Sequence, residues 1–326
     1  MLLAMTPVRI RVTPLAAYLL ALAVYSCFMC ISTLKEHQRR QYEAMTANDA
    51  GIDEDQQRPS IHRRTRSLDP PKFVTVDDFY SWLSSPETDC RKLVRFGGTY
   101  CRKTVDSDKN VCLDPDVALK PRNCTVYSFG IGHDTSFDDM SNDFGCDVFM
   151  FDPTINKSDV SSQLLKKQKF FHVGISSKNY TLLHNVTYVD SGGGEVIVGK
   201  YNTYDEIRKL VGHTNQVVHY LKVDIENTEW DVIPYLSRKG LWPGIMQIAI
   251  EVHTMAIMDL PPENVMDELQ RYARILLLLR KEGFLRVSYR PNYVEETLYK
   301  VPGENRSIPT CSEVLYIRRG PRLIDI

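Results

Sequence analysis

Two glycines in the stretch SFGIGHD, Gly130 and Gly132, separate an apolar run from a helix-like segment. Glycine lets a backbone approach a ligand closely, and the first turn of a helix presents free N–H groups. Asp152 ends the next apolar run, twenty residues after Gly132. A carboxylate at that place can accept hydrogen bonds from both hydroxyls of a ribose. The third glycine of the dinucleotide fingerprint is missing, because Thr135 stands there. The combination predicts a nucleoside site.

A second set of ionisable residues ends two other apolar runs, YLKVDIE and IAIEVH. Alternation along a strand places Lys222, Asp224 and Glu226 on one face, and likewise Glu251 and His253. If the two strands are neighbours, these groups converge at one edge of the sheet, where function tends to cluster. His253 is the predicted general base, because its ordinary pKa lies near neutral pH. Two structural roles stay open: a histidine satisfied by a carbonyl, and carboxylates that cap helices.

Two further patterns predict structure instead of chemistry. The triple glycine Gly192 to Gly194 lacks the lysine that a phosphate loop needs, so we expect a hairpin turn before EVIVG. The cysteines beyond the N-terminal apolar run contain no CxxC pair, which argues against zinc. Their number is even, as a disulfide set requires, and the pairing is open. These cysteines are Cys90, Cys101, Cys112, Cys124, Cys146 and Cys311.

Alternating strand and helix signals must position these residues. Strands are expected at 124–132, 146–154, 169–176, 217–226, 244–253, 284–290 and 311–319. Helices are expected at 133–145, with Ser136 and Asp139 as a capping box, after Asn227, with Thr228 and Asp231 as another, and from Pro262 to Gly283.

Apolar strands separated by helices predict an α/β fold with a doubly wound, mostly parallel sheet. The last two strands are separated by about twenty polar residues without a helix pattern, so they should pair as an antiparallel hairpin. A parallel sheet that ends in such a hairpin fits the S-adenosylmethionine-dependent methyltransferase fold better than a dinucleotide oxidoreductase.

The N-terminal part of the chain predicts a membrane anchor. Residues 15–34 carry no charge and are about long enough to cross a bilayer. A cleaved signal peptide is the alternative, because basic residues precede the run and Ala21-Leu22-Ala23 resembles a cleavage site. We expect a cytoplasmic tail and signal anchor at 1–34, a flexible polar stem at 35–71 and a folded domain at 72–326.

Glycosylation acceptors give the expected orientation. Five N-x-S/T tripeptides begin at Asn123, Asn156, Asn179, Asn185 and Asn305. They predict a type II, single-pass protein of the secretory pathway, in the Golgi or the endoplasmic reticulum, with release by cleavage in the stem left open. The 326-residue chain has a formal net charge of -1, so it lacks the basic field that nucleic-acid binding needs.

Five segments, taken in order, resemble one known family. They are CRKLVRFGG (90–98), DKNVCLD (108–114), VYSFGIGHDTSFDDM (126–140), GCDVFMFDPT (145–154) and LKVDIENTEWDVI (221–233). They look like the methyltransferase-like protein 24 family, which is similar to FkbM-type methyltransferases with their LKIDVEGxE junction. The resemblance covers roughly residues 75 to 320.

This resemblance implies a class I, Rossmann-like methyltransferase that binds S-adenosyl-L-methionine and methylates oxygen. The residues expected to bind the cofactor are Phe129, Gly130, Ile131, Gly132, Asp134 and Asp152. The residues expected in catalysis are Lys222, Asp224, Glu226 and His253. Ser128 stands where many methyltransferases have an acid, and Asn227 replaces the FkbM-type glycine.

We therefore expect transfer of a methyl group to a hydroxyl of a secretory-pathway substrate such as a glycan. Two alternatives stay open. An anchor, a stem and a luminal α/β domain are also typical of Golgi glycosyltransferases, and Asp224-Ile225-Glu226 resembles their acidic metal motif. A non-catalytic domain that kept the methyltransferase fold is the other alternative, and Ser128 and Asn227 favour it.

Overall fold

The computed structural model describes residues 70–319, apart from 102–103, 118, 133, 156–159, 161–163, 188–193 and 294–296. These residues all lie in one unit of the chain, Arg66–Ile326. The predicted anchor and the predicted stem as far as residue 69 lie outside the described residues. None of the helices in the described part combines the length and the apolar character that crossing a bilayer requires.

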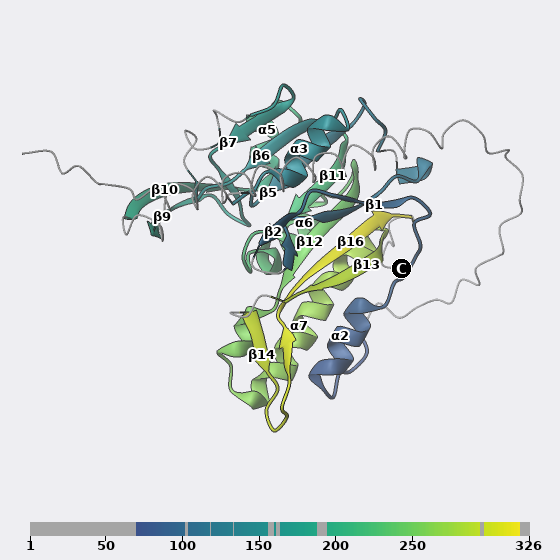
Figure 1. Ribbon diagram of the computed structural model, residues 1–326, viewed down its shortest axis with the longest axis vertical. Helices are drawn as coiled ribbons and strands as arrows, with labels where there is room; N and C mark the ends of the chain where they lie inside the picture. The colour runs from purple at the N-terminus through teal and green to yellow at the C-terminus, as the bar shows by residue number, and fades with distance from the viewer. Residues whose placement is uncertain are drawn as a thin grey trace, which may run out of the picture. The chain divides into compact units, whose positions relative to one another are not determined.

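A seven-stranded sheet forms the centre, in the order β13-β16-β12-β11-β5-β6-β7 (Figure 1). Its strands are β5 Thr125–Phe129, β6 Asp147–Phe151, β7 Gln168–Phe171, β11 Val218–Val223, β12 Ile245–His253, β13 Phe284–Asn292 and β16 Cys311–Arg318. The strands from β12 to β7 are parallel, and β16 runs antiparallel to β12 and β13. The predicted fold class is confirmed.

The direction in which strands are added reverses at β5. β6 and β7 extend the sheet on one side of β5, whereas β11 and β12 extend it on the other. Ligands of open α/β sheets bind at the carboxyl ends of the strands near such a switch. The segments that follow β5 and β11 meet there, because the Asp224 N–H donates to the Phe129 carbonyl at 3.2 Å.

One face of the sheet packs on helices. These are α2 Val76–Ser84, α5 Tyr204–Leu210, α6 Glu229–Lys239 and α7 Pro262–Lys281. Tyr127, Phe151 and Leu221 from the strands share one apolar core with residues of all four helices. Trp230 of α6 stacks on Tyr272 of α7 with ring centroids 4.0 Å apart. Burial of these large side chains supplies the main driving force for folding.

The other face is covered by α3 Ser136–Asp143 and by an antiparallel pair, β1 Leu93–Phe96 and β4 Lys109–Cys112. Phe137 of α3 contacts Tyr220 of β11, which alternates with the core residue Leu221. Gln247 of β12 exchanges two hydrogen bonds of 2.8 Å with the backbone of Cys112. The pair β1-β4 therefore packs a segment that precedes the sheet in sequence against β12 and β16.

The helix caps differ from the prediction. Ser136 lies inside α3, whose N-cap is Thr135, and the Asp134 carboxylate accepts from the Ser136 N–H at 2.8 Å. Thr228 is the N-cap of α6, but its side chain makes no capping bond. Both predicted capping boxes are therefore wrong: the Asp134 carboxylate takes the end of α3, and the N-cap side chain of α6 makes no capping bond. A complete capping box, Thr75 with Asp78, begins α2 instead.

Two strand predictions need correction. The expected strand at 169–176 is two strands in different sheets, β7 and β8 Gly174–Ile175, because the chain bends at His172. The last two strands pair as predicted, but a small hairpin of β14 Leu298–Lys300 and β15 Ser307–Pro309 lies between them. The expected hairpin before EVIVG is present as β9 Tyr180–Thr187 and β10 Gly194–Asn202. Its turn, 188–193, lies outside the described residues.

The remaining elements are β2 Thr99–Cys101, β3 Thr104–Asp106, η1 Pro115–Val117 and η2 Met255–Met258.

Two disulfides link Cys90 to Cys112 and Cys124 to Cys146. The second joins the residues just before β5 and β6, so it ties together the two strands on either side of α3. Cys311, in contrast, is an unpaired and buried thiol on β16 of the large sheet. The even cysteine count therefore does not produce a complete set of pairs.

Candidate active site

The two glycines after β5 have different surroundings. Both have positive φ, 74° at Gly130 and 57° at Gly132. A Cβ atom on Gly130 would lie 1.6 Å from the Asp224 carbonyl oxygen, whereas a Cβ on Gly132 would have no neighbour within 4 Å. Gly130 is therefore required where the loop packs against the end of β11. Gly132 borders space that a ligand can use.

Asp152 holds this loop. Its side chain is 3% exposed. One carboxylate oxygen accepts from the N–H groups of Ile131 at 2.8 Å and Gly132 at 3.0 Å. The other accepts from the N–H of Thr154 at 2.7 Å and from its hydroxyl at 2.6 Å. The ribose contact of Asp152 stays a prediction, and the structure adds a role in fixing the backbone around Gly132.

The other predicted cofactor residues have distinct places. The Phe129 ring is buried and stacks on Phe151 with centroids 4.6 Å apart, so only its backbone faces the loop. Ile131 is buried as well. Asp134 caps α3 with one oxygen and accepts from the Thr99 hydroxyl with the other. Its carboxylate thus joins the cofactor loop to the segment that follows β1.

A buried polar group lies beneath the loop, between β5, β11 and α3. Lys222 is 4% exposed and donates to the Gly130 carbonyl. Ser128 and Asp138 are fully buried next to each other, and no residue outside this pair hydrogen-bonds to their side-chain oxygens among the described residues. Burial raises the pKa of Asp138 to about 7, although the Lys222 charge and the Ser128 hydroxyl oppose the shift. Asp138 supplies a carboxyl beside Ser128, the position that departs from the family pattern.

The predicted convergence of ionisable groups is confirmed, because β11 and β12 are parallel neighbours. The nitrogen His253 Nε2 lies 3.6 Å from Glu226 Oε2 and 3.9 Å from Glu251 Oε2. Asp224 Oδ2 lies 3.4 Å from the ammonium group of Lys222. Carboxylates and an imidazole therefore gather where the two strands end.

We expected strand alternation to bring Glu226 to this cluster, but the structure places it there by a turn. β11 ends at Val223, and the backbone turns left-handed at Glu226 and Asn227, with φ of 50° and 72°. A glycine adopts such φ values freely, and asparagine tolerates them better than most residues. Asn227 thus preserves the backbone turn for which FkbM-type sequences use glycine. The turn leaves the Glu226 side chain 74% exposed.

His253 is oriented by α6. Its side chain is 2% exposed, and Nδ1 lies 2.9 Å from Glu229 Oε1, so its ring meets a carboxylate and not a carbonyl. Burial disfavours the imidazolium, but the Glu229 hydrogen bond and the charges of Glu229, Glu251 and Asp224 raise the pKa of His253 to about 10. The ring therefore carries a proton at neutral pH without a ligand. Its role as a base stays a prediction that requires loss of that proton.

Lys109 and Glu313 complete the cluster and were not predicted as site residues. Lys109 of β4 is 1% exposed, and its ammonium group contacts Glu313 of β16 and lies 3.3 Å from Asp224 Oδ2. The available sequence signal was an aspartate-lysine pair, Asp108 and Lys109, at the start of an apolar run in the DKNVCLD segment. Contacts that span more than one hundred residues leave no local pattern that predicts them.

The charged groups of the cluster shift one another's pKa values. Burial opposes the Lys109 charge, but Glu313 and Asp224 raise the pKa of Lys109 well above its usual value. Burial also opposes ionisation of Asp224, yet Lys109 and Lys222 hold its pKa well below the usual value. Burial and the charges of Asp224 and Glu313 raise the pKa of Glu251. Asp224 is therefore the ionised carboxylate, and Glu251 binds its proton more tightly.

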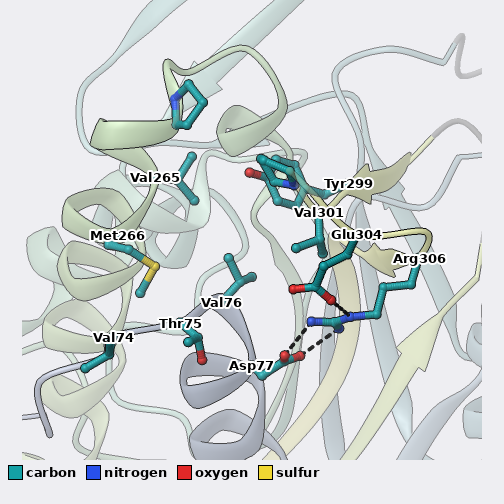
Figure 2. A pocket seen from close by; sticks show the side chains of 12 residues that line it. Val74, Thr75, Val76, Asp77, Val265, Met266, Tyr299, Val301, Glu304 and Arg306 are labelled. Atoms are coloured by element: carbon teal, nitrogen blue, oxygen red, sulfur yellow. Dashed lines mark hydrogen bonds and ion pairs between the residues drawn. The ribbon is translucent and has the colours of Figure 1, made fainter.

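A cavity of about 260 Å³ lies elsewhere, between the starts of α2 and α7 and the hairpin β14-β15. Figure 2 shows Val265, Met266 and Tyr299 around it and an ion pair at its rim, where Arg306 Nη1 donates to Asp77 at 2.9 Å. No predicted site residue lines this cavity. We therefore place the candidate active site at the carboxyl edge of the sheet.

The strand order, the reversed strand β16 and the glycine loop at the switch point define a Rossmann-like α/β protein of the methyltransferase type. A family model described as a methyltransferase domain matches residues 52–302. The chain belongs to this methyltransferase-domain family.

Curated relatives agree with the resemblance seen in the sequence. The chain is 29% identical over 152 residues to the probable methyltransferase-like protein 24 of Rattus norvegicus, covering 44% of this chain and 38% of the relative. Against the human protein of that name it is 29% identical over 153 residues, covering 44% and 37%. The matched segment thus spans less than half of these relatives. The predicted family resemblance is confirmed.

Solved structures of similar topology are distant. A fibrillarin pre-rRNA processing protein of Methanococcus jannaschii aligns with a TM-score of 0.33 and 10% identity, over 69% of this chain and 83% of its own. The plantazolicin methyltransferase BpumL, in complex with SAH, aligns with a TM-score of 0.29 and 10% identity, over 60% and 76%. The family assignment rests on the family match and not on these likenesses.

Proposed function

We propose that this methyltransferase uses S-adenosyl-L-methionine to methylate a hydroxyl oxygen of a secretory-pathway substrate such as a glycan. The observation that carries the proposal is the loop at the switch point, where Asp152 fixes the backbone and Gly132 borders open space. The family match supports methyl transfer. A distant solved methyltransferase was captured in complex with SAH, which is what S-adenosylmethionine becomes after it has lost its methyl group.

The residues present fit this cofactor. Gly132 permits close approach of the nucleoside, and Asp134 and Asp152 are carboxylates at the loop that would accept from its hydroxyls in exchange for part of their present hydrogen bonds. When bound, S-adenosylmethionine supplies a methyl group on a positively charged sulfonium. Asp224, an ionised carboxylate at the adjoining strand end, favours a cation nearby.

The cluster beside the loop is suited to orient an acceptor hydroxyl. In the transfer, the acceptor oxygen forms a C–O bond to the methyl carbon as the C–S bond breaks, and the hydroxyl proton passes to a base. Asp224 is the proposed proton acceptor at this edge, and His253 would accept the proton only after it has lost its own. Positioning of the two substrates supplies most of the acceleration, because displacement at a methyl group needs an in-line approach.

Location in the secretory pathway is a further part of the proposal. Two disulfides support an oxidising compartment. Three of the acceptor asparagines, Asn123, Asn179 and Asn305, are exposed in the described part of the chain. A glycan acceptor is consistent with that location, and the net charge of -1 argues against nucleic acid as the substrate.

An assay of methyl transfer tests the proposal. The full-length chain would be incubated with S-adenosylmethionine labelled on the methyl group and with a panel of oligosaccharides, and label in each product would be measured. We expect label on oxygen of one glycan class, and loss of it in Gly132→Val. A folded protein that binds the cofactor but labels no glycan would overturn the glycan part. A folded protein that does not bind it would overturn the cofactor part and favour a non-catalytic domain.

A further inference from the structure

Three groups that can ligate a metal converge at the ends of β11 and β12. The carboxylates of Asp224 and Glu226 and the imidazole of His253 each offer one ligand atom, and these atoms lie within 4.8 Å of one another. The Glu251 carboxylate adjoins them, 3.9 Å from His253 Nε2. His253 and Glu251 belong to β12, whereas Asp224 and Glu226 follow the end of its parallel neighbour β11, where the backbone turns left-handed.

Carboxylates outnumber cationic groups around His253. The carboxylates are those of Asp224, Glu226, Glu229, Glu251 and Glu313, whereas the cationic groups are Lys109, Lys222 and the protonated His253 ring itself. Buried carboxylates need protons, cationic side chains or a metal ion to balance them. The cluster as a whole therefore favours an additional cation.

Two buried carboxylate oxygens without a partner are an independent indication of a cation here. Glu313 Oε2 and Glu229 Oε2 have no hydrogen-bond partner among the described residues, although both side chains are at least nine-tenths buried. Glu313 is the register partner of Glu251 on the antiparallel strand β16, so it lies on the same face. Its second carboxylate oxygen, Oε2, therefore lies beside the cluster and accepts no hydrogen bond from the described residues.

The histidine is also oriented as a ligand. Glu229 holds Nδ1 at 2.9 Å, which directs Nε2 toward Glu226 and Glu251. Metal-ligating histidines commonly donate their second ring N–H to a carboxylate, which fixes the ring orientation and raises its basicity. Glu229 supplies that carboxylate from the first turn of α6.

We propose that Asp224, Glu226 and His253 bind one divalent transition-metal cation of the Mn²⁺ type, with Glu251 as a neighbouring carboxylate. Carboxylates suit Mg²⁺, Ca²⁺ or Mn²⁺, whereas an imidazole nitrogen suits transition metals, so Mn²⁺ is the transition metal that fits a ligand set dominated by carboxylates. Binding releases the proton of His253 to solvent, because the metal takes the nitrogen lone pair. The bound cation would lower the pKa of an acceptor hydroxyl that it contacts. That consequence rests on the proposed function, but binding of the cation does not.

A second set, Glu251, His253 and Cys311, shares the histidine and is fully buried. Burial raises the pKa of the Cys311 thiol to about 12, so a thiolate ligand is disfavoured there. Cys311→Ser is therefore a matched control, because it removes a ligand atom from the second set and none from the proposed site.

The test is a titration of the chelator-treated full-length chain with MnCl₂, in which the electron paramagnetic resonance signal of free Mn²⁺ is measured. We expect one Mn²⁺ per chain, unaffected by a large excess of Mg²⁺. Loss of a direct ligand should weaken binding at least ~10-fold in Asp224→Asn and Glu226→Gln, and Cys311→Ser should bind as the wild type does. Glu226 is 74% exposed, so Glu226→Gln should fold, which thermal unfolding would check.

Two results would overturn the proposal: a folded wild-type chain without stoichiometric Mn²⁺, or Asp224→Asn and Glu226→Gln chains that bind it as the wild type does. Loss of binding in Cys311→Ser alone would assign the metal to the other set and would also overturn it. A separate titration with S-adenosylmethionine keeps failure of the metal site distinct from failure of the proposed methyl transfer.

Discussion

At the scale of single residues, substitutions at Gly130 and Gly132 show why each position needs a glycine, either for packing or for the approach of a ligand. Gly130→Ala would place Cβ against the Asp224 carbonyl. We expect a loss in the free energy of unfolding of roughly 2–5 kcal/mol from overpacking and backbone strain. Gly132→Ala has open space, so strain alone should cost about 1–2 kcal/mol. Denaturant unfolding of both variants measures the difference. Equal losses would contradict the described contact between the loop and β11.

Asp138 gives a pH-dependent prediction. Its pKa rises from 3.8 to about 7 in the folded chain through burial, with Lys222 and Ser128 opposing the shift and Asp139 and Asp134 adding to it. The folded state therefore binds more protons than the unfolded state between these two pH values. Its stability falls as pH rises through that window, by about 1.4 kcal/mol for each unit of difference.

Asp138→Asn removes this ionisation while keeping the size of the side chain. At pH 8 we expect the variant to be more stable than the wild type, on the order of 4 kcal/mol, and the gain should shrink as the pH falls toward 4. Urea unfolding at pH 5 and pH 8 provides the comparison, with Asp139→Asn on the same helix as a control. A gain that does not depend on pH would rule out the buried carboxyl as its cause.

Residue types predicted part of this site. Gly130, Gly132 and Asp152 were identified because a strand, a turn and a helix follow one another locally. Glu226 was placed by alternation, which fails because β11 ends at Val223 and the chain then turns left-handed. Lys109 and Glu313 were missed, since their contacts depend on the way β4 packs against β12 and β16.

At the scale of elements, the meeting of β11 and β12 could be predicted, because apolar strands in a parallel sheet carry their ligands at one edge. The division of 169–176 into β7 and β8 could not, since it depends on pairing of β8 with β10, more than twenty residues away. The caps of α3 and α6 were mispredicted for a similar reason. The Asp134 carboxylate takes the end of α3, whereas Glu229, in the first turn of α6, accepts from the Ile225 N–H and lies beside His253.

The disulfide between Cys124 and Cys146 should stabilise the β5-α3-β6 unit. It closes a segment with a sequence separation of 22 residues. Restriction of the unfolded chain over such a loop corresponds to about 3 kcal/mol. We expect the double variant Cys124→Ser, Cys146→Ser to lose stability of that order in thermal unfolding. Cys311→Ser is the control without a disulfide, and an equally stable double variant would show that the bond has no such role.

At the scale of the whole molecule, exposure of Asn123, Asn179 and Asn305 predicts modification in the secretory pathway. The full-length chain produced in animal cells should decrease in apparent mass on treatment with an N-glycosidase. Single Asn→Gln changes at these three positions should each remove one step of that decrease, as seen by gel mobility. A chain whose mobility the enzyme leaves unchanged would contradict the proposed location.

The central claim is that the loop between β5 and α3 binds S-adenosylmethionine, and calorimetric titration of this cofactor into the full-length chain tests it most directly. The wild type should bind one molecule per chain. Gly132→Val should keep its far-ultraviolet circular dichroism and lose binding, because its side chain fills the space beside the loop. A folded wild type that does not bind the cofactor, or a Gly132→Val chain that binds it equally well, would contradict the account.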